Sequence, residues 1–143
     1  MNMKKIFSVC ALLIAAFPWS SWAEWTGDSS INYYSDEVIT GFHVGQYNSS
    51  EYFCIKTVKQ SGGGTPIIAC ALSKQSKWLP SFFNTMLEQA RYFYSTGQSI
   101  RVYVEPNVWT DRSFVAALSS NALVGLSSCS STSECFGPVR PKM

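Results

Sequence analysis

The chain has 143 residues, 46% of them hydrophobic and 15% aromatic, and its 11 basic and 9 acidic residues give a formal net charge of +2. This length suits one domain with a modest core. Lys and Arg form no cluster beyond the first residues. That pattern argues against a nucleic-acid-binding protein, because such proteins need a basic patch to neutralise phosphates.

The first residues have the features of a secretory leader. A basic Lys4-Lys5 pair precedes an apolar run over residues 6–17 that is too short to span a bilayer, and Ser21-Trp22-Ala23 fits the small-x-small pattern of a cleavage site. We therefore predict a signal peptide over residues 1–23 and a mature domain over residues 24–143, exported through the periplasm and secreted. Without the lysine pair, the mature chain has nine basic and nine acidic residues, so its formal charge is zero.

The mature chain keeps four cysteines, Cys54, Cys70, Cys129 and Cys135. An even set in an exported chain predicts disulfides. Of the three possible connectivities, Cys54 with Cys70 and Cys129 with Cys135 is favoured because the members of each pair are close in sequence. Zinc binding is the competing interpretation, but short Cys-x-x-Cys spacing and supporting histidines are lacking. We predict no metal site and no cofactor.

Three strand-like stretches come first in the mature chain. Residues 38–44 alternate between the two faces of a strand, and Gly41 within them indicates a bulge. Residues 52–58 form a second predicted strand, and the glycines at 62–64 form the turn of a hairpin. Residues 66–72 are apolar throughout, which predicts a third, buried strand.

Residues 80–97 are the only segment with a clear helical pattern. Apolar residues recur at three- and four-residue steps, and Gly97 supplies a left-handed end. The predicted apolar stripe consists of Phe83, Leu87, Ala90 and Tyr94, widened by Phe82, Met86 and Phe93. The opposite face carries Glu88, Gln89, Arg91 and Tyr92, which suit a solvated face or the wall of a channel. Periodicity alone favours the solvated face.

Two more strands are predicted after the helix, over residues 99–104 and 122–126. Residues 114–118 are either helical or extended, and the tail over residues 137–143 is expected to be loose. Three strands, a helix and two strands match the OB-fold, a five-stranded Greek-key barrel with its helix between the third and fourth strands. An open α+β sheet is the alternative, because this pattern does not give the strand order.

The chain offers little for catalysis. His43 is the only histidine and lies within a predicted strand, where a lone histidine is usually packed or solvated. Asp36 and Glu37 are neighbours on a strand, so their carboxylates should point to opposite faces. The glycines at 62–64 lack the Lys and Ser/Thr of a phosphate-binding loop. These observations predict a protein that is not an enzyme.

Several longer strings resemble one family. They are Glu-Trp-Thr-Gly-Asp at 24–28, Tyr-Tyr-Ser-Asp-Glu-Val-Ile at 33–39, Tyr-Phe-Cys-Ile-Lys at 52–56, Ala-Arg-Tyr-Phe-Tyr-Ser-Thr-Gly-Gln at 90–98, Asn-Ala-Leu-Val-Gly-Leu-Ser-Ser-Cys at 121–129 and Cys-Phe-Gly-Pro at 135–138. Together they are similar to the B subunits of the typhoid toxin and subtilase cytotoxin family of A-B toxins. The similarity covers essentially the whole mature chain. It implies an OB-fold subunit of a homopentameric ring that binds sialylated host-cell glycans and carries a toxin A subunit.

The same resemblance implies a set of glycan-binding residues: Tyr33, Tyr34, Ser35, Lys59, Thr65, Arg101 and Val104. A hydroxyl donor, a cation and an aromatic wall suit the carboxylate and glycerol chain of sialic acid. Without the resemblance, the two tyrosines would be interpreted as a strand edge and Lys59 as a solvated charge.

Three other features of the resemblance bear on specificity and assembly. Val104 stands where the subtilase branch has Tyr, and Val offers no partner to an N-glycolyl hydroxyl, which predicts a preference for N-acetylneuraminic acid. In a ring, the polar helix face of Glu88, Gln89, Arg91 and Tyr92 would line a pore. Relatives tend to have Trp-Thr-Tyr-Pro where this chain has Trp109-Thr110-Asp111-Arg112, which puts secondary glycan contacts in doubt.

Two other functions compete with the toxin subunit. An exported OB-fold protein that binds a protein partner, such as an enzyme inhibitor, is the runner-up, and a hydrolase of small substrates comes third. The sequence does not identify the A subunit.

Overall fold

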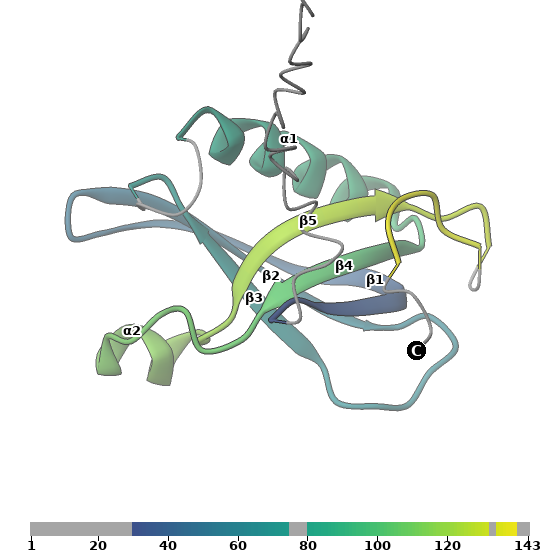
Figure 1. The fold of residues 1–143 in the computed structure, drawn as a ribbon, viewed down its shortest axis with the longest axis horizontal. Coiled ribbons are helices and arrows are strands. Elements are labelled where there is room, and N and C mark those ends of the chain that lie inside the picture. Colours follow the sequence, from purple (N-terminus) through teal and green to yellow (C-terminus); the bar gives the residue numbers. More distant parts are fainter. Residues whose placement is uncertain (1–29, 75–79, 132–133, 140–143) are drawn as a thin grey trace, which may run out of the picture.

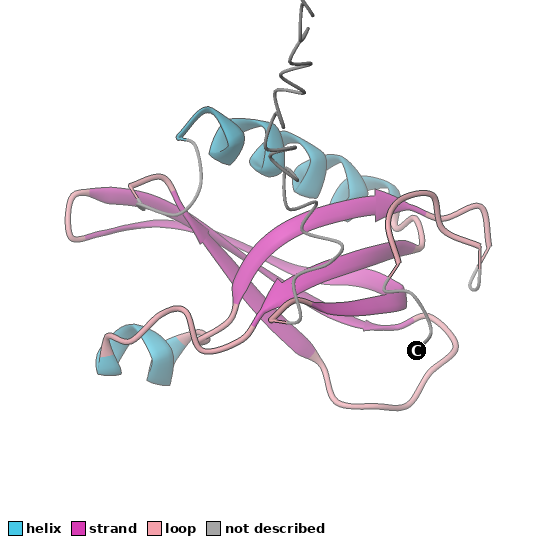
Figure 2. Ribbon diagram, viewed as in Figure 1, coloured by secondary structure: helices cyan, strands magenta, loops and turns pink. Residues whose placement is uncertain are grey.

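The computed structural model describes residues 30–74, 80–131 and 134–139. The predicted signal peptide lies outside the described residues. The elements are β1 (Asn32–Tyr47), β2 (Ser50–Lys59), β3 (Ile67–Leu72), α1 (Pro80–Thr96), β4 (Ile100–Glu105), α2 (Arg112–Ala117) and β5 (Ala122–Ser128) (Figures 1 and 2). No helix among the described residues is long and apolar enough to cross a membrane.

The strands form a closed barrel in the order β1-β2-β3-β5-β4, with β4 pairing back onto β1. β3 and β5 pair in parallel at Cys70 and Ala122, while the other neighbouring strands pair antiparallel. This order, with α1 between β3 and β4, is the predicted OB-fold. The open-sheet alternative is therefore wrong. In Figure 1, α1 lies along the barrel, whereas α2 lies within the connection between β4 and β5, away from α1.

The first strand is much longer than the predicted 38–44. Its pairing with β2 shifts in register between Ile39 and Gly41, which confirms the predicted bulge. Because Thr40 is the extra residue, the inward-facing side chains change from Ile39 to Phe42, which packs against the core. A second irregularity, on the β4 side, lies between Tyr34 and Glu37. Both irregularities let one strand bend between two partners.

The helix α1 covers the barrel with a slightly different stripe from the predicted one. Phe83, Met86, Ala90 and Phe93 are buried, whereas Leu87 is only partly buried and Tyr94 is exposed. The buried residues follow one another at steps of three, four and three, so Met86, and not Leu87, belongs to the buried stripe. The ring of Tyr94 still stacks on Phe42, with centroids 5.8 Å apart. Gly97, at φ 65°, ends the helix as predicted, and its N–H donates to the Phe93 carbonyl.

Both predicted disulfides are present. Cys54 and Cys70 are directly opposed on the neighbouring strands β2 and β3 and are buried, so this bond links the two strands within the barrel wall. Cys129 and Cys135 close a loop after β5. Because Cys54, Cys70, Cys129 and Cys135 are all in disulfides, the zinc alternative is wrong. No group of three or more potential metal ligands occurs among the described residues.

The undecided segment at 114–118 is mostly helical, as α2. Asp111 caps α2: one of its carboxylate oxygens accepts from the Phe114 N–H at 2.9 Å and from the Ser113 hydroxyl at 2.6 Å. The hydrogen bonds from Ser113 and from the Tyr47 hydroxyl, with the Phe114 N–H, lower the pKa of Asp111 to about 2. The Asp111 carboxylate in turn raises the pKa of Tyr47.

The cap predicts a change in acid stability. The folded pKa of Asp111 is lower than its ordinary 3.8, so the stabilising effect of the carboxylate is complete above that value and is lost as the pH falls towards about 2. Thermal unfolding of Asp111→Asn should show a melting temperature below that of the wild type at about pH 5, with the two converging near pH 2. Glu51→Gln, at an exposed carboxylate, is the control and should follow the wild type. A constant gap between Asp111→Asn and the wild type across this range would contradict the assignment.

Candidate functional site

The structure brings three of the predicted glycan-binding residues together around one hollow. Tyr34 of β1, Lys59 at the end of β2, and Thr65 of the loop before β3 line a hollow of about 560 Å³. Its other walls include Glu37, Ile68 and Asn121. Apolar and polar groups therefore meet in an open depression, which is typical of a site for a polar ligand with one apolar face.

The cation of the hollow, Lys59, is held by β1. Its Nζ lies 3.2 Å from Glu37 Oε1 and also donates to the Ser35 carbonyl. Glu37 is only 2% exposed and its second oxygen accepts from the buried Thr57 hydroxyl at 2.7 Å, whereas the Lys59 side chain remains 38% exposed. The buried carboxylate thus fixes an ammonium that stays accessible at the rim. The contacts of Glu37 with Lys59 and Thr57 explain its position without any role in acid-base catalysis.

The loop that carries Thr65 is attached to β1 through Asp36. The Asp36 carbonyl accepts from Gln60 N–H at 2.8 Å, and its carboxylate accepts from the Ser61 hydroxyl. Asp36 therefore faces the loop while Glu37 faces Thr57, so the two carboxylates are separated as predicted, although Asp36 lies at the irregularity of β1 and has a φ of 64°. The three glycines at 62–64 all have positive φ, between 79° and 86°, a backbone conformation that residues with a Cβ rarely adopt.

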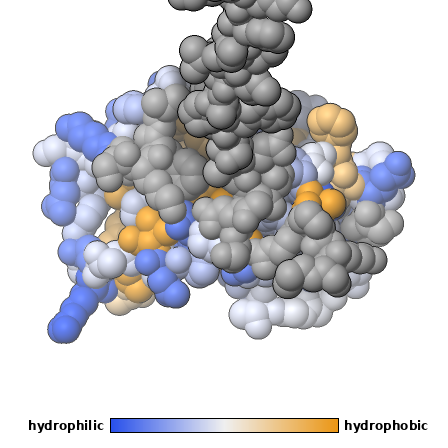
Figure 3. Space-filling model, viewed as in Figure 1, coloured by the Kyte–Doolittle hydropathy of each residue, from blue (hydrophilic) through white to orange (hydrophobic). Residues whose placement is uncertain are grey.

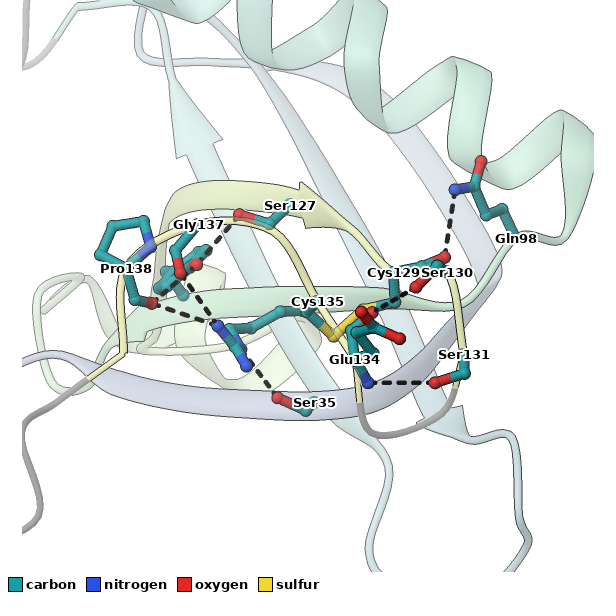
Figure 4. The surroundings of a disulfide bond; sticks show 12 residues. Ser35, Gln98, Ser127, Cys129, Ser130, Ser131, Glu134, Cys135, Gly137 and Pro138 are labelled. Atoms are coloured by element: carbon teal, nitrogen blue, oxygen red, sulfur yellow. Dashed lines mark hydrogen bonds between the residues drawn. A yellow bond between two sulfur atoms is a disulfide. The ribbon is translucent and has the colours of Figure 1, made fainter.

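Ser35 and Arg101 form a second group beside the hollow. Arg101 Nε donates to the Ser35 hydroxyl oxygen at 2.8 Å, and its Nη1 donates to the carbonyls of Gly137 and Pro138, each at 3.3 Å (Figure 4). The expectation of a loose tail is therefore wrong for Gly137 and Pro138, while residues 140–143 lie outside the described residues. Arg101 is only 7% exposed.

The two tyrosines lie on different sides of β1. Tyr34 packs against the main core and lines the hollow, whereas Tyr33 packs edge-on against Tyr103, with ring centroids 5.2 Å apart. Alternation along the strand explains the divergence, since Tyr33 shares its side with Ser35. The predicted aromatic wall of two tyrosines therefore reduces, at the hollow, to Tyr34.

Val104 is not part of this arrangement. It is 1% exposed and packs in the core with Val102 and Leu123. Because neighbouring strand residues alternate, Val104 points into the barrel and Arg101 points out of it. The expectation that Val104 borders a pocket with Arg101 is wrong in the geometry of the isolated chain.

The polar face of α1 is open. Glu88, Gln89, Arg91 and Tyr92 are all exposed, as both the solvated-face and the pore interpretation require. Figure 3 shows small hydrophobic patches among hydrophilic residues on one face of the molecule. Exposed large hydrophobic residues among those described are Val44, Phe82, Tyr92, Tyr94, Phe136 and Val139.

Sequence reasoning missed several residues that build the site. The sequence predicts at most an unpromising acid-base role for Glu37, and it predicts no role for Thr57, Tyr103 or the tail carbonyls. Tyr103 donates to the Pro138 carbonyl at 3.0 Å and its hydroxyl lies 2.9 Å from that of Ser127. One signal in the sequence does point to this pair: Glu37 and Thr57 are polar residues in strands whose other inward-facing residues are mostly apolar.

Comparison with known proteins identifies the family. The chain is 49% identical to the B subunit of the subtilase cytotoxin of Escherichia coli over 143 residues, covering 99% of both chains. A mutant PltB homopentamer of Salmonella typhi, solved with a Neu5Ac-α-2-3-Gal-β-1-4-GlcNAc glycan, is 63% identical with a TM-score of 0.75, and the match covers 80% of this chain and 98% of the other.

A chain from an E. coli AB5 toxin, solved with Neu5Gc-2,3Gal-1,3GlcNAc, is 50% identical with a TM-score of 0.74, and the match covers 84% of this chain and 100% of the other. No family model matches the sequence. With 49% identity over nearly its whole length to the subtilase cytotoxin protein, the chain belongs to the family of AB5 toxin B subunits.

Proposed function

We propose that this chain is the receptor-binding B subunit of a secreted AB5 toxin, which binds sialylated glycans on host cells and delivers a catalytic A subunit. The single observation that carries the proposal is the close likeness, in sequence and fold, to a PltB homopentamer solved with a sialylated glycan. On this proposal the chain has no enzymatic activity of its own. It reaches the outside through the periplasm after loss of residues 1–23.

The chemistry of the candidate site supports an anionic sugar as the ligand. Lys59 of β2 offers an accessible ammonium, which donates to the carbonyl of Ser35 on the neighbouring strand β1. Arg101 is almost fully buried, and its side-chain contacts among the described residues are with a hydroxyl and two carbonyls, none of which carries a negative charge. Buried charges are usually paired, so a sialic-acid carboxylate near Ser35 would balance this cation. Tyr34 and Thr65 would contact the rest of the sugar.

A preference for N-acetylneuraminic acid is part of the proposal. Val104 no longer supplies its reason, because the side chain is in the core. What supports the preference is that the relative solved with a Neu5Ac glycan is more similar to this chain than the relative solved with a Neu5Gc glycan.

A glycan array tests the proposed function directly. The purified mature chain should bind sialylated probes and not their desialylated counterparts, and within pairs that differ only in the N-acyl hydroxyl it should bind the Neu5Ac member at least as strongly. Absence of all sialoglycan binding would reject the proposal and leave the runner-up, an exported OB-fold protein that binds a protein partner. Stronger Neu5Gc binding would reject the preference alone.

Ser35→Ala should weaken sialoglycan binding in the same assay by roughly 10- to 150-fold while the oligomer persists. Loss of a hydroxyl that meets a carboxylate costs about 1.5 to 3 kcal/mol, as for hydrogen bonds to charged groups. The melting temperature should fall little, because Arg101 keeps its two carbonyl acceptors. Ser95→Ala is the matched control, since this hydroxyl only contacts the Arg91 carbonyl on α1. Binding by Ser35→Ala at the wild-type level would place the site elsewhere.

The proposed assembly is a homopentamer, with Glu88, Gln89, Arg91 and Tyr92 lining its pore. A ring with cyclic symmetry buries one patch of each copy against a different patch of its neighbour, so it closes at a fixed number of copies. Native mass spectrometry of the mature chain should give five copies. A stable monomer at micromolar concentration would contradict the ring.

A further inference from the structure

The C-terminal segment of residues 136–139, which we call the strap, crosses the outer face of β4. Three hydrogen bonds from two donor groups hold it there: Arg101 Nη1 donates to the Gly137 and Pro138 carbonyls, each at 3.3 Å, and Tyr103 Oη donates to the Pro138 carbonyl at 3.0 Å (Figure 4). All the acceptors are backbone carbonyls, so these contacts depend on where the backbone of the strap runs and not on hydrogen bonds from its side chains. The strap begins directly after a disulfide, which fixes its starting point.

The anchor is the Cys129–Cys135 disulfide. It turns the chain back after β5, and Phe136 N–H then donates to the Ser128 carbonyl at 3.0 Å. Gly137 follows at φ 119°, a conformation that L side chains rarely adopt. A Cβ at this position would overlap the Ser127 hydroxyl and lie 2.8 Å from Tyr103 Oη. The strap therefore lies on β4 only because residue 137 has no side chain.

The same guanidinium that holds the strap also contacts Ser35. Arg101 Nε donates to Ser35 Oγ at 2.8 Å. The N–H groups of a guanidinium share one rigid plane, so carbonyls that fix Nη1 also fix the direction of Nε. With an acceptor site of its oxygen occupied by Nε–H, the Ser35 hydroxyl must direct its own hydrogen elsewhere. It is thereby set as a donor.

We propose that the strap positions the ligand-binding hydroxyl of Ser35 through Arg101, so that Arg101 is a positioning residue and Lys59 is the cation that meets the sialic-acid carboxylate directly. The division follows from exposure: Arg101 is 7% exposed, whereas the Lys59 side chain is 38% exposed. The inference rests on the proposed sialoglycan function and deepens it. The strap thus acquires a role in the site, although its described contacts with Arg101 are made by backbone carbonyls and not by side chains.

Gly137→Ala tests the strap without altering any residue of the site. The added methyl group must displace the strap, which releases Nη1 and with it the orientation of Nε. Calorimetric titration of the assembled protein with the trisaccharide Neu5Acα2-3Galβ1-4GlcNAc should show a fall in affinity on the order of tenfold, as expected for a weakened hydrogen bond to a charged group. Gly97→Ala is the matched control: it also has positive φ, at 65°, but has open space around it, and it should bind like the wild type.

A double variant distinguishes positioning from a general loss of structure. If the strap acts through the Ser35 hydroxyl, Gly137→Ala should weaken residual binding no further in a Ser35→Ala background. Independent, multiplying effects would overturn the inference, and so would wild-type affinity in Gly137→Ala. Should Gly137→Ala fail to assemble, Tyr103→Phe, which removes one of the donors to Pro138, should still lower affinity several-fold, and no change would again overturn it. Failure of the wild type itself to bind the trisaccharide would reject the proposed function instead.

Discussion

Closure of the barrel through β1 is the constraint on which the rest of this structure depends. β1 pairs with β2 over most of its length and with β4 near its beginning, so this one strand joins the first strand pair to the last and closes the barrel at a seam. A regular strand could not follow both partners, and the irregularities after Tyr34 and Ile39 provide the bends. The candidate site lies at the first of them. There Ser35 turns to β4 while Glu37 turns to β2, so closure itself brings Arg101 and Lys59 to one strand segment.

The distribution of charge around this seam favours an anion. Two cations, Lys59 and Arg101, converge on the backbone and side chain of Ser35, and the carboxylate paired with them among the described residues is Glu37, which contacts Lys59. Glu37 is buried and also bonded to Thr57, so it cannot move to serve Arg101. The nearby Asp36 carboxylate accepts from Ser61, so the described side-chain partners of Arg101 are a hydroxyl and two carbonyls and include no carboxylate. A carboxylate-bearing ligand is a better complement to this buried cation than a neutral sugar.

Features encoded by neighbouring residues could be predicted from the sequence, and features that depend on distant pairing could not. Gly97, the bulge at Gly41 and the cysteine pairs are local, and each prediction is confirmed. The element order of the OB-fold was predictable for the same reason. The side to which Val104 points is not predictable from alternation alone, because pairing with β1 and β5 decides which face of β4 points inward. The sequence leaves the helix α2 undecided because six residues give only a weak helical pattern. Its formation depends on the cap at Asp111.

The strap shows why a site can depend on residues that no local pattern marks. Arg101 is 66 residues from Ser35 and 36 from Gly137, and nothing in either neighbourhood indicates a contact. What links them is the disulfide at Cys135, which limits where the following residues can go, and a glycine that alone allows the close approach. Backbone carbonyls then accept from Arg101, so among the strap residues only Gly137 is constrained by this contact in its side chain. Substitutions at the strap could therefore change ligand binding among related subunits while every residue of the hollow stayed the same, so alignments restricted to pocket residues would miss the cause.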